Sequence, residues 1–243
     1  MLGLGAGGHF LGPRIDRSTS PVRLYGLLEI GIGLWAVATP FLLQAVTGAW
    51  AAAASRLEPG LALATLLKAV LSAVVLLPPA MAMGGTFPAL VRAVSETREK
   101  APGTVGVLYA LNVLGAVGGS LLAGFVLPEL FGERNAMNLT GLLNVLLGTL
   151  VLAAARGIPP IGSSSQPAQE GLLASLRLLG ATAGGRFVLT GLVVSGVTTM
   201  IVEIVFVRIL GLVFGVSSYS FTLVLAVFLT GLGLGALVAG LLS

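Results

Sequence analysis

The chain has 243 residues, of which 56% are hydrophobic and only 9% are charged, compared with about 25% charged residues in an average soluble domain. The mean hydropathy of +1.04 excludes a soluble globular protein, a disordered tail and a nucleic-acid-binding arm. Without cysteine, the chain can build neither a disulfide framework nor a thiolate metal site. Strand-length alternation is absent, so the composition predicts an all-α polytopic membrane protein.

Long apolar stretches follow one another along the chain. Residues 1–12 are apolar and rich in glycine, but they are too short to cross a bilayer, which takes about 20 apolar residues. They are predicted to be part of a helix. The later breaks fall at polar segments that contain proline or glycine. These breaks predict six complete spans, at 21–47, 60–91, 103–127, 133–155, 187–214 and 217–241.

The second span contains an unusual segment, in which Pro78 and Pro79 precede Gly84 and Gly85. Proline lacks an N–H and clashes with the preceding turn, so this helix is expected to kink or break. A broken helix at membrane depth has to be buried or to line a cavity. Two interpretations stay open, a packing kink and a hinge beside a substrate path.

The basic residues are distributed unequally over the two sides of the six spans. Segments 13–23, 92–100 and 156–186 would lie on one side and hold nine of the 13 Lys and Arg residues, whereas the opposite loops hold two. Cytoplasmic loops carry an excess of Lys and Arg, so these three segments are predicted to be cytoplasmic. The net charge of +4 therefore reflects topology and does not indicate a nucleic-acid partner.

A short internal repeat relates the two ends of the sequence. Residues 3–12 match residues 231–240 at five of ten positions, four of them glycine, at an offset of 228. Six crossings separate the two segments, so both would enter the cytoplasm in the same direction, as in a parallel repeat of six-helix units. The repeat predicts that this chain is a fragment of a larger protein. The chain would then have three parts: a partial first bundle at 1–156, a cytoplasmic linker at 157–185 and the first two helices of a second bundle at 186–243.

The linker contains one segment with helical spacing. Leu172, Leu173, Leu176 and Leu179 recur as on one face of a helix. Both a short helix on the membrane surface and a simple turn before the next span are consistent with this pattern.

Four apolar strings carry a resemblance to a known family. They are LYGLLEIGIGL (24–34), LPPAMAMGGTFPALVRA (77–93), GVLYALNVLGAVGGSLLAGFVL (106–127) and IVEIVFVRILGLVFGVSSYSFTLVLAVFLTGLGLGALVAG (201–240). In this order they resemble the membrane domain of bacterial fused major-facilitator/spermidine-synthase-like proteins. The resemblance implies a major-facilitator-like fold in the bacterial inner membrane.

In that family a cytoplasmic aminopropyltransferase-like domain follows the membrane domain. No stretch of this chain combines a strand with a Gly-rich nucleoside loop and acidic residues that would hold an amine substrate. The family's catalytic residues therefore have no matching positions here. No enzyme activity, cofactor or metal site is expected of this chain.

Polar residues inside the spans are the functional candidates, because charges are costly in a bilayer. The candidate intramembrane polar or ion site consists of Glu29, Glu203, Arg208, Asn112 and Tyr109. Each Glu is expected either to lock helices together as a paired or protonated carboxyl, or to bind a cation or proton at a cavity. Asn112 is expected to form an interhelical hydrogen bond. Glu203 and Arg208 are five residues apart and poorly placed for an ion pair within one helix.

Three further features are predicted to serve packing or local hydrogen bonding. Tyr25 lies one turn before Glu29 and is expected to donate a hydrogen bond to it. Trp35 lies in the middle of its span and is expected to pack against neighbouring helices. Small residues four apart let helices approach closely, and the pairs expected to do so are Gly3/Gly7, Gly115/Gly119 and Gly231/Gly235.

Three functions are consistent with these observations. The first is a membrane module of a spermidine-synthase-like fusion protein, which anchors and supports an enzyme without catalysis of its own. The second is a structural accessory subunit of a larger membrane complex. The third is a major-facilitator-like transporter of a small cationic solute such as a polyamine. The expected partners are the lipid bilayer and other integral subunits, or the remainder of the chain's own polypeptide.

Overall fold

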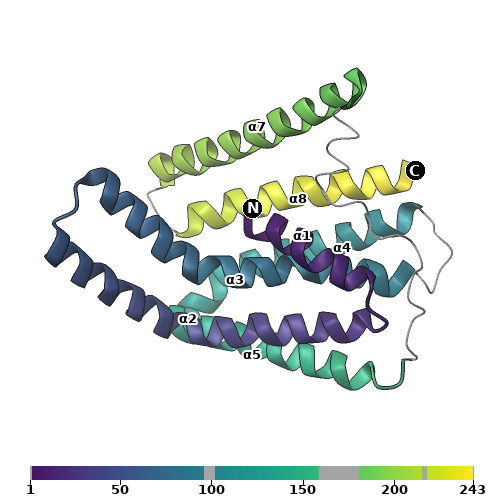
Figure 1. Ribbon diagram of the computed structural model, residues 1–243, viewed down its shortest axis with the longest axis horizontal. Coiled ribbons are helices and arrows are strands. Elements are labelled where there is room, and N and C mark those ends of the chain that lie inside the picture. Colours follow the sequence, from purple (N-terminus) through teal and green to yellow (C-terminus); the bar gives the residue numbers. More distant parts are fainter. Residues whose placement is uncertain (1, 96–101, 159–180, 215–217, 243) are drawn as a thin grey trace. The chain divides into compact units, whose positions relative to one another are not determined.

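The computed structural model describes residues 2–95, 102–158, 181–214 and 218–242. Every regular element among them is helical (Figure 1), which confirms the predicted all-α class. Five segments are long and apolar enough to cross a membrane: Pro21–Arg56, Leu61–Val94, Gly106–Ala154, Gly184–Val213 and Ser218–Val238. The linker segment with the four regularly spaced leucines lies outside the described residues.

One of these segments contains two of the predicted spans. Gly106–Ala154 has 49 residues and would measure about 73 Å as a straight helix, more than twice the hydrocarbon thickness of a bilayer. Gly132 interrupts it with a φ of 74° and a ψ of 159°. This backbone conformation is unfavourable for residues other than glycine. The five segments therefore provide five or six crossings, and the exact number stays a prediction.

The chain folds into two compact units. The first unit comprises Met1–Glu99 and Glu133–Ser165, and the second comprises Lys100–Gly132 and Gln166–Ser243. The boundary at Gly132 lies inside helix α5 (Leu127–Ala154), so the two ends of this helix belong to different units. The predicted division into a partial first bundle, a linker and the first two helices of a second bundle stays a prediction.

The first unit contains α1 (Leu2–Asp16), α2 (Pro21–Leu57), α3 (Leu61–Ser95) and the part of α5 after Gly132. Helix α1 runs parallel to α3, with Gly3 against Ala80 and Gly7 against Met81. Glycine brings the backbones close together, and a Cβ at Gly7 would clash with the backbone carbonyl of Met81.

Glycines also join α2 to α5 in this unit. The two helices are antiparallel, because Gly26 faces Gly148 and Gly33 faces Gly141. At all four positions a Cβ would lie within 3 Å of the carbonyl oxygen of the facing glycine. Small residues on both helices therefore allow van der Waals contact between the backbones, as is common between membrane helices.

The second unit contains α4 (Pro102–Leu121), the π-helix η1 (Leu122–Val126), α7 (Ala183–Phe214) and α8 (Ser218–Leu242). Helices α4 and α8 are antiparallel neighbours. Gly106 faces Gly240, and Gly233 faces Val113 farther along the pair. Helix α7 packs against α8 more loosely than α4 does, and the most apolar stretch of α7 is not buried within the described residues.

Some predicted boundaries are wrong. Helix α2 ends at Leu57, ten residues beyond the predicted end of its span at residue 47. The additional turns include four consecutive alanines at 51–54, and alanine has the highest helix propensity of all residues. The helix ends where Glu58 adopts a left-handed conformation with a φ of 40°, and the Glu58 N–H donates to the carbonyl oxygen of Ala54.

Candidate functional sites in the membrane helices

Helix α3 contains Pro78 and Pro79 but is not broken by them. It is continuous from Leu61 to Ser95, so the predicted break is absent, while a hinge function stays a prediction. Proline removes the N–H that would bond to the carbonyl four residues earlier. For Pro79 the carbonyl left without its helical donor is that of Val75.

The indole of Trp35 supplies the donor that Pro79 lacks. Trp35 Nε1 on α2 donates to the carbonyl oxygen of Val75 at 2.9 Å. Val75 is buried, with only 3% of its surface exposed, so water cannot readily replace this bond. Trp35 was predicted only as a packing residue, although the spacing of Val75 and Pro79 indicates a carbonyl in need of a donor.

Gly84 and Gly85 follow the two prolines and face other helices of the unit. Gly84 lies against Leu4 and Gly7 of α1, whereas Gly85 lies against Leu11 of α1 and Leu28 of α2. A Cβ at either position would approach these atoms too closely. The two glycines therefore allow α1 and α2 to pack against α3.

Glu29 is the buried acidic residue of the first unit. It lies on α2 with 9% of its surface exposed. Tyr25 lies one turn earlier on α2, and its phenol interacts electrostatically with the Glu29 carboxylate. Burial of this carboxyl beside Tyr25 is consistent both with a locking role and with a proton site.

The other four members of the predicted polar site belong to the second unit. Tyr109 and Asn112 are exposed on α4, Glu203 is partly exposed on α7, and Arg208 is exposed on the same helix. Neither Glu203 nor Arg208 forms an ion pair or hydrogen bond within the described part of the chain. Within each unit, therefore, the structure does not gather the predicted residues into one cluster.

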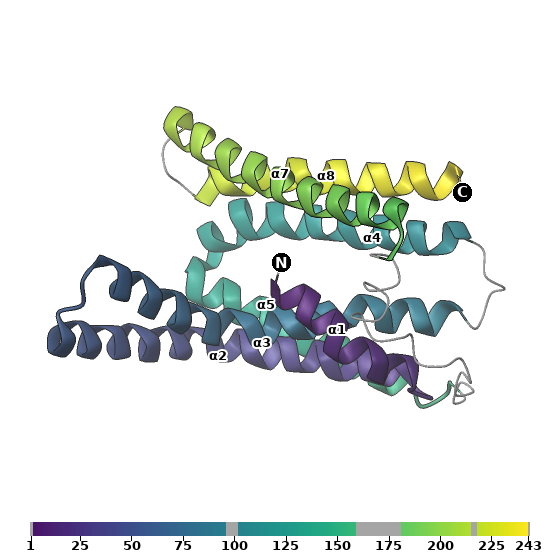
Figure 2. The ribbon, with the colours of Figure 1, turned by 45° about the horizontal axis from the view of Figure 1, so that its top comes forward.

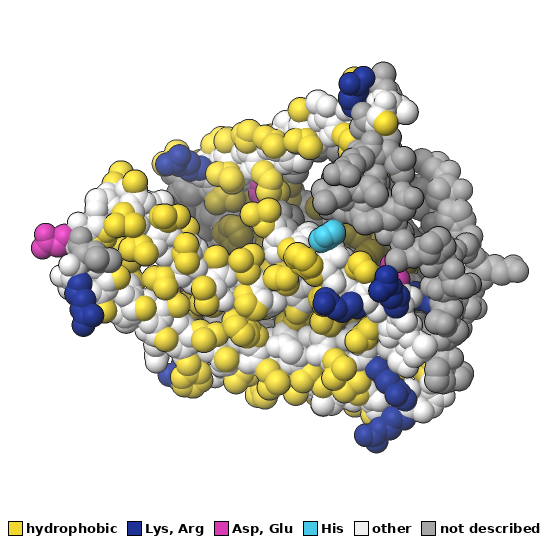
Figure 3. Space-filling model, in the orientation of Figure 1, with side chains coloured by type: hydrophobic (Ala, Val, Ile, Leu, Met, Phe, Trp, Pro, Cys, Tyr) yellow, Lys and Arg dark blue, Asp and Glu magenta, His cyan; other side chains and the backbone are white. Residues whose placement is uncertain are grey.

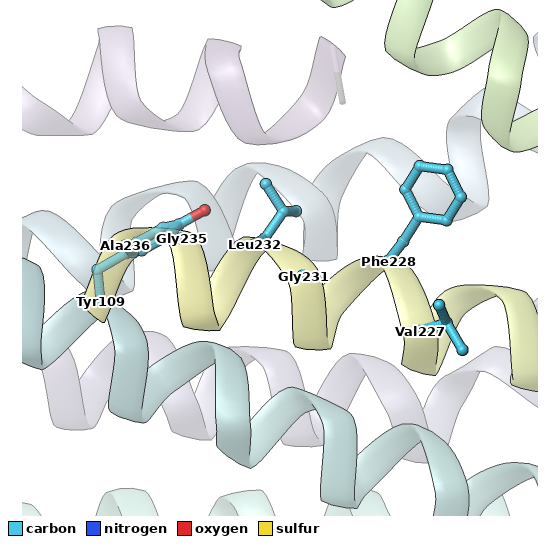
Figure 4. A pocket seen from close by; sticks show the side chains of 7 residues that line it. All are labelled: Tyr109, Val227, Phe228, Gly231, Leu232, Gly235 and Ala236. Carbon is cyan, nitrogen blue, oxygen red and sulfur yellow. The ribbon is translucent and has the colours of Figure 1, made fainter. Parts of the chain in front are cut away.

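A shallow apolar groove follows α8 in the second unit (Figure 4). It has a volume of about 610 Å³ and is lined by Tyr109 of α4 and by Val227, Phe228, Gly231, Leu232, Gly235 and Ala236 of α8. A Cβ at Gly231 or Gly235 would meet no atom within 4 Å. The same is true of Gly115 and Gly119 on α4, so none of these four glycines packs closely against the rest of the described chain.

One polar contact was not predicted. Tyr219 at the start of α8 donates from its hydroxyl to Glu129 Oε1 at 2.6 Å. Its ring stacks on Phe125 of η1, with centroids 5.3 Å apart and an interplanar angle of 18°. These contacts join the start of α8 to η1 and to the first turn of α5. The partners are 90 residues apart in sequence, so local spacing gives no sign of the pair.

The described residues contain no group of three or more His, Cys, Asp or Glu side chains that would hold a metal ion. Comparison of the chain with protein-family models, curated proteins and solved structures finds no match. The fold and its apolar helices define the class: this is an all-helical, multi-pass membrane protein.

Proposed function

We propose that this chain is a membrane scaffold module, without catalysis of its own, that binds further transmembrane helices. The proposal depends on the repeat that relates residues 3–12 to residues 231–240. In α1 two glycines of this pattern, Gly3 and Gly7, pack against α3. Their counterparts in α8, Gly231 and Gly235, line the open groove.

The opposite face of the pattern shows the converse arrangement. In α8, Gly233 and Gly240 pack against α4, whereas their counterparts Gly5 and Gly12 in α1 have no atom within 4 Å of a built Cβ. Each copy thus uses one of its two glycine faces. Because Gly3 and Gly7 of α1 contact α3, the equivalent open face of α8, at Gly231 and Gly235, would bind a similar helix. The α8 groove would therefore receive a helix that resembles α3.

Glu203 provides independent support for further partners. It lies well inside the long span of α7, and it has no polar partner in the described residues. A carboxylate that faces hydrocarbon costs about 2.5–3.5 kcal/mol or more. A partner helix that brings a donor or a cation to Glu203 would remove this cost.

The resemblance to fused major-facilitator/spermidine-synthase-like proteins gives this proposal a setting. The module would lie in the bacterial inner membrane, with segments 13–23, 92–100 and 156–186 in the cytoplasm. It would adopt a major-facilitator-like arrangement and anchor a spermidine-synthase-like enzyme. The alternative partner is a set of other integral subunits, for which the chain would be a structural accessory subunit.

The groove is tested with a helix of known sequence. A synthetic peptide of residues 70–94, which carries the α3 face that Gly3 and Gly7 contact, is labelled with an acceptor dye. The full chain with Leu223→Cys, which is exposed on α8 outside the groove lining, carries the donor dye, and energy transfer is measured in lipid vesicles. We expect specific association that becomes at least about tenfold weaker when Gly231 and Gly235 are both replaced by leucine.

Gly48→Leu is the matched control, because Gly48 on α2 also has open space around a built Cβ. It should leave the association unchanged. Equal binding to the groove variant and to the control, or no binding to the unaltered groove, would contradict the proposal.

A second candidate function is transport of a small cationic solute, and the buried Glu29 favours it. Glu29→Gln retains the size of the side chain, but it removes the carboxylate. If the chain is a transporter that uses this group, uptake of a polyamine into vesicles should fall at least about tenfold in Glu29→Gln. Unchanged uptake in Glu29→Gln, with Glu203→Gln measured in parallel, would exclude a carboxylate-dependent transporter.

A further inference from the structure

Helices α2 and α3 are longer than a bilayer requires. They have 37 and 35 residues, which correspond to about 55 and 52 Å, whereas the hydrocarbon core of a bilayer is about 30 Å thick. In the same unit, the part of α5 after Gly132 measures about 33 Å and matches the bilayer. The excess length therefore belongs to the α2–α3 hairpin.

The packing of α5 shows where the excess begins. The guanidinium carbon of Arg134, near the start of this part of α5, lies 5.1 Å from the centroid of the Phe41 ring on α2. Beyond Phe41, α2 continues for about 24 Å to its end at Leu57. Figures 1 and 2 show that the hairpin extends past the end of α5. We call residues 42–56 and 61–71 the overhang.

The surface of the overhang is apolar around both helices. None of its described residues is buried, and the partly exposed ones recur at helical spacing where α2 and α3 face each other. Large apolar side chains are exposed along it: Leu43, Leu61, Leu63, Leu66 and Val70. On the face that Figure 3 shows, hydrophobic side chains lie along the hairpin, with acidic and basic side chains at its outer end.

The polar groups of the overhang are arranged as in a lipid environment. Thr47, Ser55 and Thr65 donate from their hydroxyls to carbonyl oxygens of their own helix, at 2.8–3.1 Å. Lys68 Nζ lies 4.7 Å from the centroid of the Trp50 ring, and long basic side chains of this kind reach towards the membrane surface. Gln44 and Arg56 are exposed and are the exceptions among the described polar residues of the overhang, and Arg56 lies at its outer end.

We infer that lipid acyl chains cover the overhang as far as its turn, so that the hairpin is tilted and the bilayer beside it is locally thicker. A protein partner would cover one face of the hairpin, whereas the apolar surface surrounds both helices. Water would leave two helices with only each other to pack against, which is marginal for stability. A tilt of about 40° would reduce the extent of α2 along the membrane normal from about 55 to about 42 Å, and local thickening of the bilayer would cover the remaining length.

The inference rests on the membrane-spanning assignment but not on the scaffold function. The chain has no cysteine, so single cysteines can be introduced without a further change. The test position is Leu66→Cys, which is 60% exposed and lies near the middle of the overhang. Glu58→Cys at the turn is the water-exposed reference, and Leu146→Cys on α5, 54% exposed, is the membrane-embedded reference.

The purified full chain is placed in nanodiscs of dioleoyl phosphatidylcholine and treated with a water-soluble maleimide. We expect Leu66→Cys to react at least about tenfold more slowly than Glu58→Cys, at a rate close to that of Leu146→Cys. A bimane label at Leu66→Cys should also be quenched by lipids with brominated acyl chains. Thinner dimyristoyl bilayers should speed up the reaction of Leu66→Cys relative to Leu146→Cys.

Each contrary result has a distinct meaning. Rapid reaction of Leu66→Cys with slow reaction of Leu146→Cys would show that water covers the overhang, and would overturn the inference. Slow reaction without quenching by brominated lipids would show that protein covers it, including a second copy of the chain, and would also overturn it. Rapid reaction at both positions would contradict the membrane assignment itself.

Discussion

A chain with Gly7→Ala is expected to be less stable than the wild type by about 1–3 kcal/mol, the usual cost of overpacking a close contact. Gly7 lies where α1 approaches α3, and a Cβ there would overlap the backbone carbonyl of Met81. This carbonyl belongs to a helix and cannot rotate away, so α1 would have to move. The loss should appear as a lower midpoint of unfolding in mixed detergent micelles.

Gly5→Ala is the matched control on the same helix. A Cβ at Gly5 has no atom within 4 Å, and alanine is preferred over glycine inside a helix by up to about 1 kcal/mol. This variant should therefore be as stable as the wild type or slightly more stable. If both substitutions changed the unfolding midpoint in the same direction and to the same extent, the packing of α1 against α3 would be wrong.

Replacement of Trp35 by phenylalanine is expected to destabilise the chain by about 1–3 kcal/mol, the cost of a buried carbonyl without a partner. Phenylalanine retains an aromatic ring but cannot donate to the Val75 carbonyl oxygen. Trp50→Phe retains an aromatic ring beside Lys68 and should cost less than about 1 kcal/mol. Both variants can be compared by denaturation in the same micelles.

The role of Trp35 can be separated from packing by a second substitution. Pro79→Ala restores the backbone N–H that would bond to the Val75 carbonyl oxygen within α3. In this background Trp35→Phe should cost at least about 1 kcal/mol less than in the wild-type chain, a coupling typical of residues that share a partner. Additive effects of the two substitutions would show that Trp35 acts through packing alone.

The positions of the helices could largely be predicted from the sequence, because a long apolar segment in lipid has to satisfy its backbone hydrogen bonds internally. Their ends were harder to predict. The predicted span ends at residue 47, ahead of the polar segment around Pro59, yet alanine continues the helix to Leu57. Hydropathy detects which residues avoid water, but it does not limit how far a helix extends.

Whether a contact of the candidate sites could be predicted depends on how far apart its two residues are in sequence. The proximity of Tyr25 and Glu29 follows from the helical repeat, because the two residues are one turn apart. The contacts of Trp35 with Val75 and of Tyr219 with Glu129 join residues 40 and 90 positions apart, and only the fold brings them together. The same applies to the glycines, since spacing identifies the faces that permit close approach but not the face that is occupied.

The division at Gly132 has a consequence for biosynthesis. Because residues 100–132 lie in the second unit and the next residues return to the first, α4 leaves the ribosome about 100 residues before its antiparallel neighbour α8. At translation rates of about 5–20 residues per second, this delay lasts about 5–20 s. During that time α4 has to remain in the membrane without α8, either surrounded by lipid or bound to the insertion machinery.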